Sequence, residues 1–160
     1  MSRRAEDLAQ RIEQGAQSLA SFAESLSDQE WKTVIPADGR PVGVVVHHVA
    51  NMYGVEIDLA KKIAEGEGVR GVTWSAVAEL NAKHAGEKAT VGKKEAVDLL
   101  RRNAKIAADA VRGFSDEELD RAAPVSLNSD APLTTQFFIE DHALRHSFHH
   151  LAKIRSALAK

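Results

Sequence analysis

A short stretch near the C-terminus concentrates side chains that bind metal ions. Four of the seven histidines of the chain lie within Glu140–His150. In an α-helix of about 3.6 residues per turn, residues four apart share a face, so His142, His146 and His150 form one stripe. Two imidazoles one turn apart can hold a divalent ion when a third ligand comes from elsewhere. The alternative is a solvated polar stripe, because histidine also serves as an ordinary surface or core residue.

A helical projection of this stretch separates its histidines. His150 falls inside the edge of the apolar arc and His146 lies just outside that edge, so both can face the interior of a helical protein. His142 lies on the polar flank and His149 points well away from the apolar arc. Imidazoles that face a core without partners leave donors or acceptors unmet. His146 and His150 are therefore the preferred pair of metal ligands.

The third ligand is predicted in a helix over Val42–Ala64. On its projection His48 falls at the edge of the apolar arc, whereas His47 points to the centre of the polar arc. Glu56 falls in the middle of the apolar arc, where a carboxylate needs a cation, a hydrogen-bond donor or a metal as partner. The alternative for Glu56 is a position near an opening that keeps its water. His84, on another predicted helix, is most simply a surface or half-buried residue.

Other metal and catalytic signatures are missing from the sequence. There is no H-E-x-x-H motif, and the third residue after Glu140 is Ala143, so the E-x-x-H pair of a ferritin-like di-iron bundle is not formed. No glycine-rich phosphate loop and no G-x-S-x-G elbow occur. Because the chain has no cysteine, a metal must be held by nitrogen and oxygen. The simplest such site is a metal ion with three histidine ligands and one open coordination position.

The composition matches one ordinary globular domain over residues 1–160. Hydrophobic residues make up 44% and charged residues 28% of the chain. The net charge of -2, with acids and bases mixed, gives no footprint for nucleic acid. No run of about 18 apolar residues and no secretory h-region occur, so we expect no membrane segment and a cytoplasmic location.

The periodicity of apolar residues predicts an all-α fold, a four-helix bundle with extra short helical turns. Val42–Val46 reads locally as a strand, but the length of the periodic segment favours helix. Two S-x-x-E capping boxes, beginning at Ser27 and Ser115, predict the short turns. Ala123–Ala131, which contains Pro124, is predicted as a polar loop, and no convincing strand is found. The predicted helices span about Arg3–Leu26, Val42–Ala64, Thr73–Lys88, Lys93–Phe114 and Thr134 or Thr135 to the C-terminus.

Two histidine motifs resemble those of the DinB-like metalloprotein family. One is the histidine near the start of the second bundle helix, in Val44–Ala50, and the other is the H-x-x-x-H of His146–His150. The resemblance extends over nearly the whole chain. It implies an up-down-down-up four-helix bundle, often dimeric, with zinc, nickel or a similar ion on three histidines. Matched by position, these are His48, His146 and His150.

Characterised branches of that family use a low-molecular-weight thiol, as in mycothiol-dependent maleylpyruvate isomerase and bacillithiol transferases. The resemblance therefore implies a thiol-dependent transferase or isomerase that acts on a small molecule. After the last histidine the family commonly continues Arg-Gly-Gln, whereas this chain has Leu151-Ala152-Lys153, so contacts of those residues do not transfer. Two alternatives stay open: a metal-dependent hydrolase with Glu56 as base, and a non-catalytic bundle that binds a metal or ligand.

Overall fold

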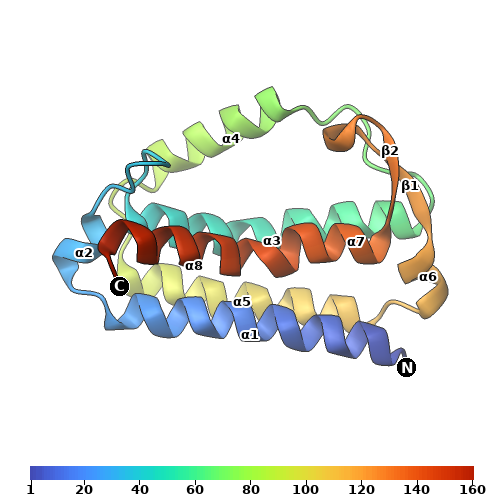
Figure 1. Cartoon of the computed structure of the whole chain (residues 1–160), viewed down its shortest axis with the longest axis horizontal. Helices are drawn as coiled ribbons and strands as arrows, with labels where there is room; N and C mark the ends of the chain where they lie inside the picture. Colours follow the sequence, from blue (N-terminus) through green and yellow to red (C-terminus); the bar gives the residue numbers. More distant parts are fainter.

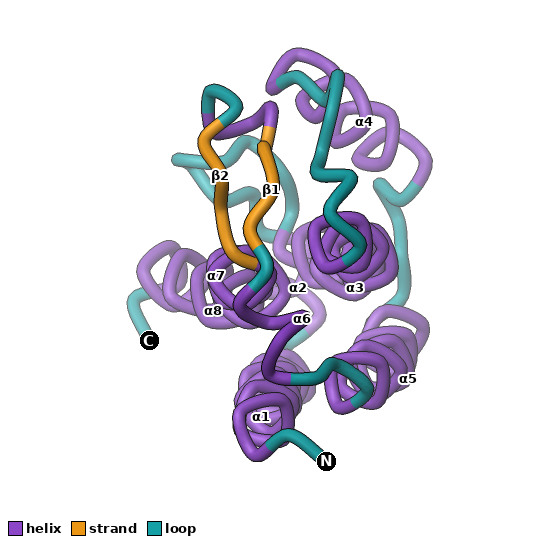
Figure 2. Tube along the Cα trace, turned by 90° about the vertical axis from the view of Figure 1, so that its right-hand side faces the viewer, coloured by secondary structure: helices purple, strands orange, loops and turns teal.

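Four long helices form the bundle, seen from the side in Figure 1 and nearly end-on in Figure 2. In the computed structural model, which describes residues 1–160, the first three are α1 (Arg3–Ser25), α3 (Val42–Ala64) and α5 (Lys93–Arg112). α1 packs on α5, α5 on α3, and the C-terminal helix closes the ring against α3 and α1. α1 and the C-terminal helix run one way while α3 and α5 run the other (Figure 1), which is the predicted up-down-down-up order.

Hydrophobic burial explains why the long segments become helices despite local ambiguity. α3 is the most enclosed of them, and every residue of Val42–Ala50 is buried. Its valines favour strand locally, but a helix of this length can bury apolar residues on nearly all sides when neighbours cover it. The prediction of a helix over Val42–Ala64 is confirmed. No helix of the structure combines the length and the hydropathy that crossing a lipid bilayer requires.

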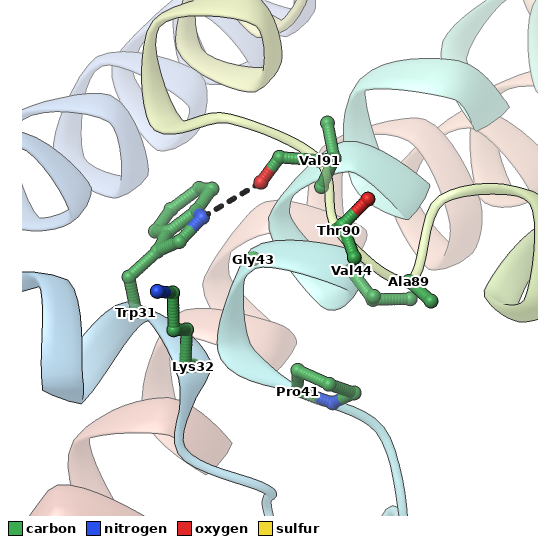
Figure 3. A pocket seen from close by; sticks show the side chains of 8 residues that line it. All are labelled: Trp31, Lys32, Pro41, Gly43, Val44, Ala89, Thr90 and Val91. Carbon is green, nitrogen blue, oxygen red and sulfur yellow. Dashed lines mark hydrogen bonds between the residues drawn. The ribbon is translucent and has the colours of Figure 1, made fainter.

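The two predicted capping boxes are both formed and start α2 (Asp28–Lys32) and α6 (Asp116–Asp120). The first of these turns delivers Trp31 to the beginning of α3, as Figure 3 shows. Trp31 donates a hydrogen bond of 3.0 Å from its indole N–H to the carbonyl of Val91. A Cβ on Gly43 would lie 2.5 Å from the indole, so only glycine allows this close approach. Trp31 thus fixes the start of α3 against the loop that leads into α5.

α4 (Trp74–Glu87) lies outside the bundle, over the face of α3 (Figure 1), and has no buried residue. The apolar spacing of the helix predicted over Thr73–Lys88 would place Trp74 and Leu80 on a buried face, but they are 61% and 67% exposed. The reason is that α4 lies outside the bundle and none of its residues is buried. Trp74 is tied down by a 3.0 Å hydrogen bond from its indole N–H to the carbonyl of Leu127.

A small β-hairpin replaces part of the predicted polar loop. β1 (Ala122–Val125) pairs antiparallel with β2 (Ala131–Thr134), and the 3-10 turn η1 (Ser126–Asn128) connects them. The prediction of no strand is therefore wrong. The hairpin was not predicted because its alanines and prolines are weak strand formers. Val125 is fully buried, and it anchors the hairpin to the core.

The C-terminal helix is divided into three sections by a wider turn. It begins as α7 (Thr135–Ile139), passes through the π-helical turn η2 (Glu140–Leu144) and continues as α8 (Arg145–Leu158). A π turn inserts extra backbone into the helix, so it changes the angular relation between residues before and after it. The predicted single helix is thus correct in extent but not in regularity. His146 and His150 both follow the π turn and keep their i, i+4 relation.

Candidate metal centre

Three histidines from two helices converge between α3 and α8. His48 Nε2 lies 3.1 Å from His146 Nε2, and one ring nitrogen each of His48, His146 and His150 lies within 4.8 Å of the others. The centroids of the three rings are 4.8 to 5.5 Å apart. His48 and His150 are buried, and 15% of the His146 side chain is exposed. These are the same three residues that the sequence placed on inward faces, and we call them the three-histidine cluster.

The arrangement follows from where each histidine stands on its helix. His48 lies in the second turn of α3, on the side that packs against the C-terminal helix. His146 and His150 lie one turn apart on α8, so their side chains project from the same face. Because α3 and α8 run antiparallel as direct neighbours (Figure 1), one ring from α3 meets two from α8.

Glu56 lies beside His146 and favours one position for the proton of its ring. It stands about two turns after His48 on α3, is 6% exposed, and brings Oε1 within 2.9 Å of His146 Nδ1. The two groups are close although the N–H direction is not aligned for a linear hydrogen bond. A carboxylate at Nδ1 favours the tautomer protonated there, which leaves Nε2 with a free lone pair. Because Glu56 is buried, the alternative that it lies near an opening is wrong.

Burial keeps two of the rings neutral. Burial, together with the nearby His146, lowers the pKa of His48 to about 3. Burial also lowers the pKa of His150 to about 2, with added repulsion from His146 and His48. Neutral imidazoles present lone pairs, and Nδ1 of His150 is buried without a hydrogen-bond partner. Three converging imidazole nitrogens suit a divalent ion such as zinc or nickel.

Sequence comparison identifies the family of the chain. The model of the DinB superfamily matches residues 11–154. The chain belongs to the DinB superfamily. Its fold also resembles a solved structure of YfiT from Bacillus subtilis, described as a probable metal-dependent hydrolase with an unusual four-helix bundle topology. The match has a TM-score of 0.74 and 20% sequence identity, and it covers 99% of this chain and 89% of that chain. No curated protein matches the sequence.

The other histidines of this DinB superfamily member lie outside the cluster. His142 stacks on Phe138 at a centroid distance of 4.1 Å. His149 is exposed, as predicted. His47, predicted on the polar side, is instead buried: its Nδ1 lies 2.8 Å from His84 Nε2, and the two rings stack at 5.0 Å. The reason is that α4 places His84 over this side of α3, which no projection of α3 alone reveals.

One set of charged residues, Asp38, Arg40 and Lys153, was not predicted from the sequence. In the loop before α3, the Arg40 guanidinium donates to Asp38 from Nε at 2.5 Å and from Nη2 at 2.9 Å. Lys153 on α8 donates to the same carboxylate at 3.1 Å. The Arg40 guanidinium holds the pKa of Asp38 well below its usual range. The sequence does show opposite charges at Asp38 and Arg40, on either side of Gly39, but this segment was interpreted only as a loop.

Proposed function

We propose that this DinB superfamily member is a divalent-metal-dependent enzyme whose ion is held by His48, His146 and His150. The observation that supports this most strongly is the contact of Glu56 with His146 Nδ1, which turns the Nε2 lone pair toward His48 Nε2 at 3.1 Å. The two imidazoles either share a proton or bind a cation together, and a shared proton leaves Nδ1 of His150 without a partner. Three ligands leave one coordination position for a reactant.

The finer proposal is a thiol-dependent transferase or isomerase. A divalent ion with an open position would lower the pKa of a thiol that binds there. The thiol would then be present as a thiolate nucleophile near neutral pH. The chain has no cysteine, so this thiol must come from a low-molecular-weight cosubstrate. The resemblance to branches that use such thiols supports the proposal. Glu56, engaged with His146, acts in it as a positioning residue.

A metal-dependent hydrolase is the second candidate, because YfiT is described as a probable member of that class. Glu56 was the predicted base for a water nucleophile. Its Oε1 meets His146 at the nitrogen that faces away from His48, while Oε2 is buried without a partner. In a hydrolase, Glu56 would therefore orient His146 rather than act as the base that contacts the water nucleophile.

One experiment separates these candidates. The protein is purified without an affinity tag, its metal content is measured by mass spectrometry, and wild type is compared with His150→Ala. Wild type is then assayed with 1-chloro-2,4-dinitrobenzene plus a physiological thiol, and with p-nitrophenyl acetate alone. Thiol-dependent turnover that His150→Ala abolishes supports the transferase, and ester hydrolysis without thiol supports the hydrolase. A protein with stoichiometric metal and neither activity would favour a non-catalytic metal site.

A further inference from the structure

Arg40 has one nitrogen that the fold leaves without a partner. Its Nε and Nη2 are both used by Asp38, at 2.5 and 2.9 Å, and only 17% of the side chain is exposed. Nη1 is buried and has no hydrogen-bond acceptor. Leaving a charged donor buried and unmet is costly, so such a group in a native fold calls for an acceptor. Asp38 fixes the guanidinium in place, which prepares the free nitrogen for a ligand.

Arg40 lies on the side of α8 that leads to the three-histidine cluster. Arg40 and Lys153 both donate to Asp38, so the guanidinium lies against α8 at the turn that follows His150. Lys153, which shares Asp38 with Arg40, follows His150 by three residues and so lies one turn further along the same side of α8. The loop before α3 and the following turn of α8 thus bring Arg40 to one side of the cluster.

The local charges favour an anion at this position. Arg40 and Lys153 carry two positive charges and share one carboxylate, Asp38, which has 5% of its side chain exposed. One positive charge remains uncompensated beside the cluster, before any metal ion is counted. Glu56 meets the cluster at His146, and Glu95 lies 4.0 Å from His47 on the other side of α3, so neither neutralises Arg40.

We propose that Nη1 of Arg40 binds a carboxylate of the small molecule that occupies the open position at the three-histidine cluster. The substrate or cosubstrate is thus an anionic molecule, with its reactive atom at the histidines and its carboxylate at Arg40. This inference rests on the proposed function, because it needs a ligand at the cluster. Arginine suits the task better than lysine, since its planar fork can hold Asp38 and a second carboxylate at once.

The test uses two thiols of equal size that differ in charge. The protein is loaded with Co²⁺, and its visible absorption is followed during titration with 3-mercaptopropionate or with the amide 3-mercaptopropanamide. We expect wild type to bind the acid about tenfold more tightly than the amide, as one hydrogen bond between charged groups supplies. Arg40→Gln should bind both thiols equally while keeping its cobalt. Arg101→Gln, which removes the same charge from an exposed pair with Glu24, should keep the preference.

Arg40→Lys covers the case in which Arg40→Gln does not fold. It keeps the charge but cannot hold Asp38 and a ligand in one fork, so the preference should fall to about threefold or less. Equal affinities in wild type, or a preference that survives in the Arg40 variants, would overturn the inference and leave the proposed function standing. A protein that binds no cobalt, or whose cobalt spectrum neither thiol alters, would overturn the proposed function and the inference together.

Discussion

Two adjacent histidines on α3, His47 and His48, are equally buried but have different surroundings. His48, 5% exposed, faces two rings from α8, and one of these is oriented by Glu56. His47, 4% exposed, meets only His84, which comes from the loosely attached α4. Its other nitrogen lies 4.0 Å from the exposed Glu95. The contrast shows that burial alone does not bring together a group of nitrogens that could hold a metal.

The decisive difference is the number of nitrogens that converge. At His47 two rings meet, and a proton shared between Nδ1 of His47 and Nε2 of His84, 2.8 Å apart, satisfies both. At His48 three rings meet, and the proton of His146 is directed to Nδ1 by Glu56, so a shared proton cannot satisfy all of them. The first arrangement is complete as a hydrogen bond, whereas the second leaves Nδ1 of His150 without a partner. The second is therefore the arrangement in which we propose a cation.

The largest expected effect separates these two histidines directly. His150→Ala should lower metal affinity by more than about 100-fold, because loss of a ligand should exceed the 10- to 100-fold cost of losing a supporting group. His47→Ala should retain one ion per chain. Inductively coupled plasma mass spectrometry of the purified variants measures both. Equal metal content in the two variants would remove the distinction between the two regions.

Glu56 provides the next largest effect. Glu56→Gln keeps the volume of the side chain but removes the charge that favours the Nδ1–H tautomer of His146. We expect zinc affinity to fall about 10- to 100-fold, measured by competition with a chromogenic chelator. Glu95→Gln is the matched control beside His47 and should leave the zinc affinity unchanged. A Glu56→Gln protein with wild-type affinity would show that the carboxylate has no part in the site.

The sequence allowed the bundle and the three converging histidines to be predicted because both depend on helical periodicity. Helices of the length of α3 and α8 hold their phase, so His48, His146 and His150 could be assigned to inward faces. His47 was misplaced because its cover, α4, is a tertiary contact that leaves no periodic signal on α3. The π turn was missed for a related reason: a projection with a fixed angle of about 100° per residue cannot represent it.

Acid should destabilise the metal-free protein through the cluster. Since the pKa values of His48 and His150 are about 3 and 2 in the folded state, against about 6.5 when unfolded, the unfolded chain binds more protons between these limits. Stability therefore rises with pH in this window and is lost as the pH falls below about 6.5. Each ring contributes a slope of about 1.4 kcal/mol per pH unit.

Urea unfolding in the presence of a chelator, at several values between about pH 4 and 6, measures this slope. His150→Phe should reduce the dependence on pH by about one histidine. His149→Phe, which changes an exposed neighbour, should reduce it much less. A His150→Phe slope identical to that of wild type would mean that His150 is not held neutral in the fold.

The smallest effect is expected for His84→Ala. It removes the 2.8 Å hydrogen bond to His47. Because His84 lies on α4, which has no buried residue, the free energy of unfolding should fall by only about 1 kcal/mol. Zinc affinity should stay unchanged, because His84 contributes no nitrogen to the cluster. Chemical denaturation and a zinc titration of the same sample test both statements. A large loss of zinc affinity would show that the two histidine regions act as one.

The most direct measurement is X-ray absorption spectroscopy of the zinc-loaded protein. The three-histidine cluster predicts three imidazole nitrogens at about 2.0 to 2.1 Å from the zinc, plus one light atom in the open position. Added thiol should replace that atom with sulfur at about 2.3 Å. A spectrum with fewer than three imidazoles, or with four and no response to thiol, would contradict an open three-histidine centre.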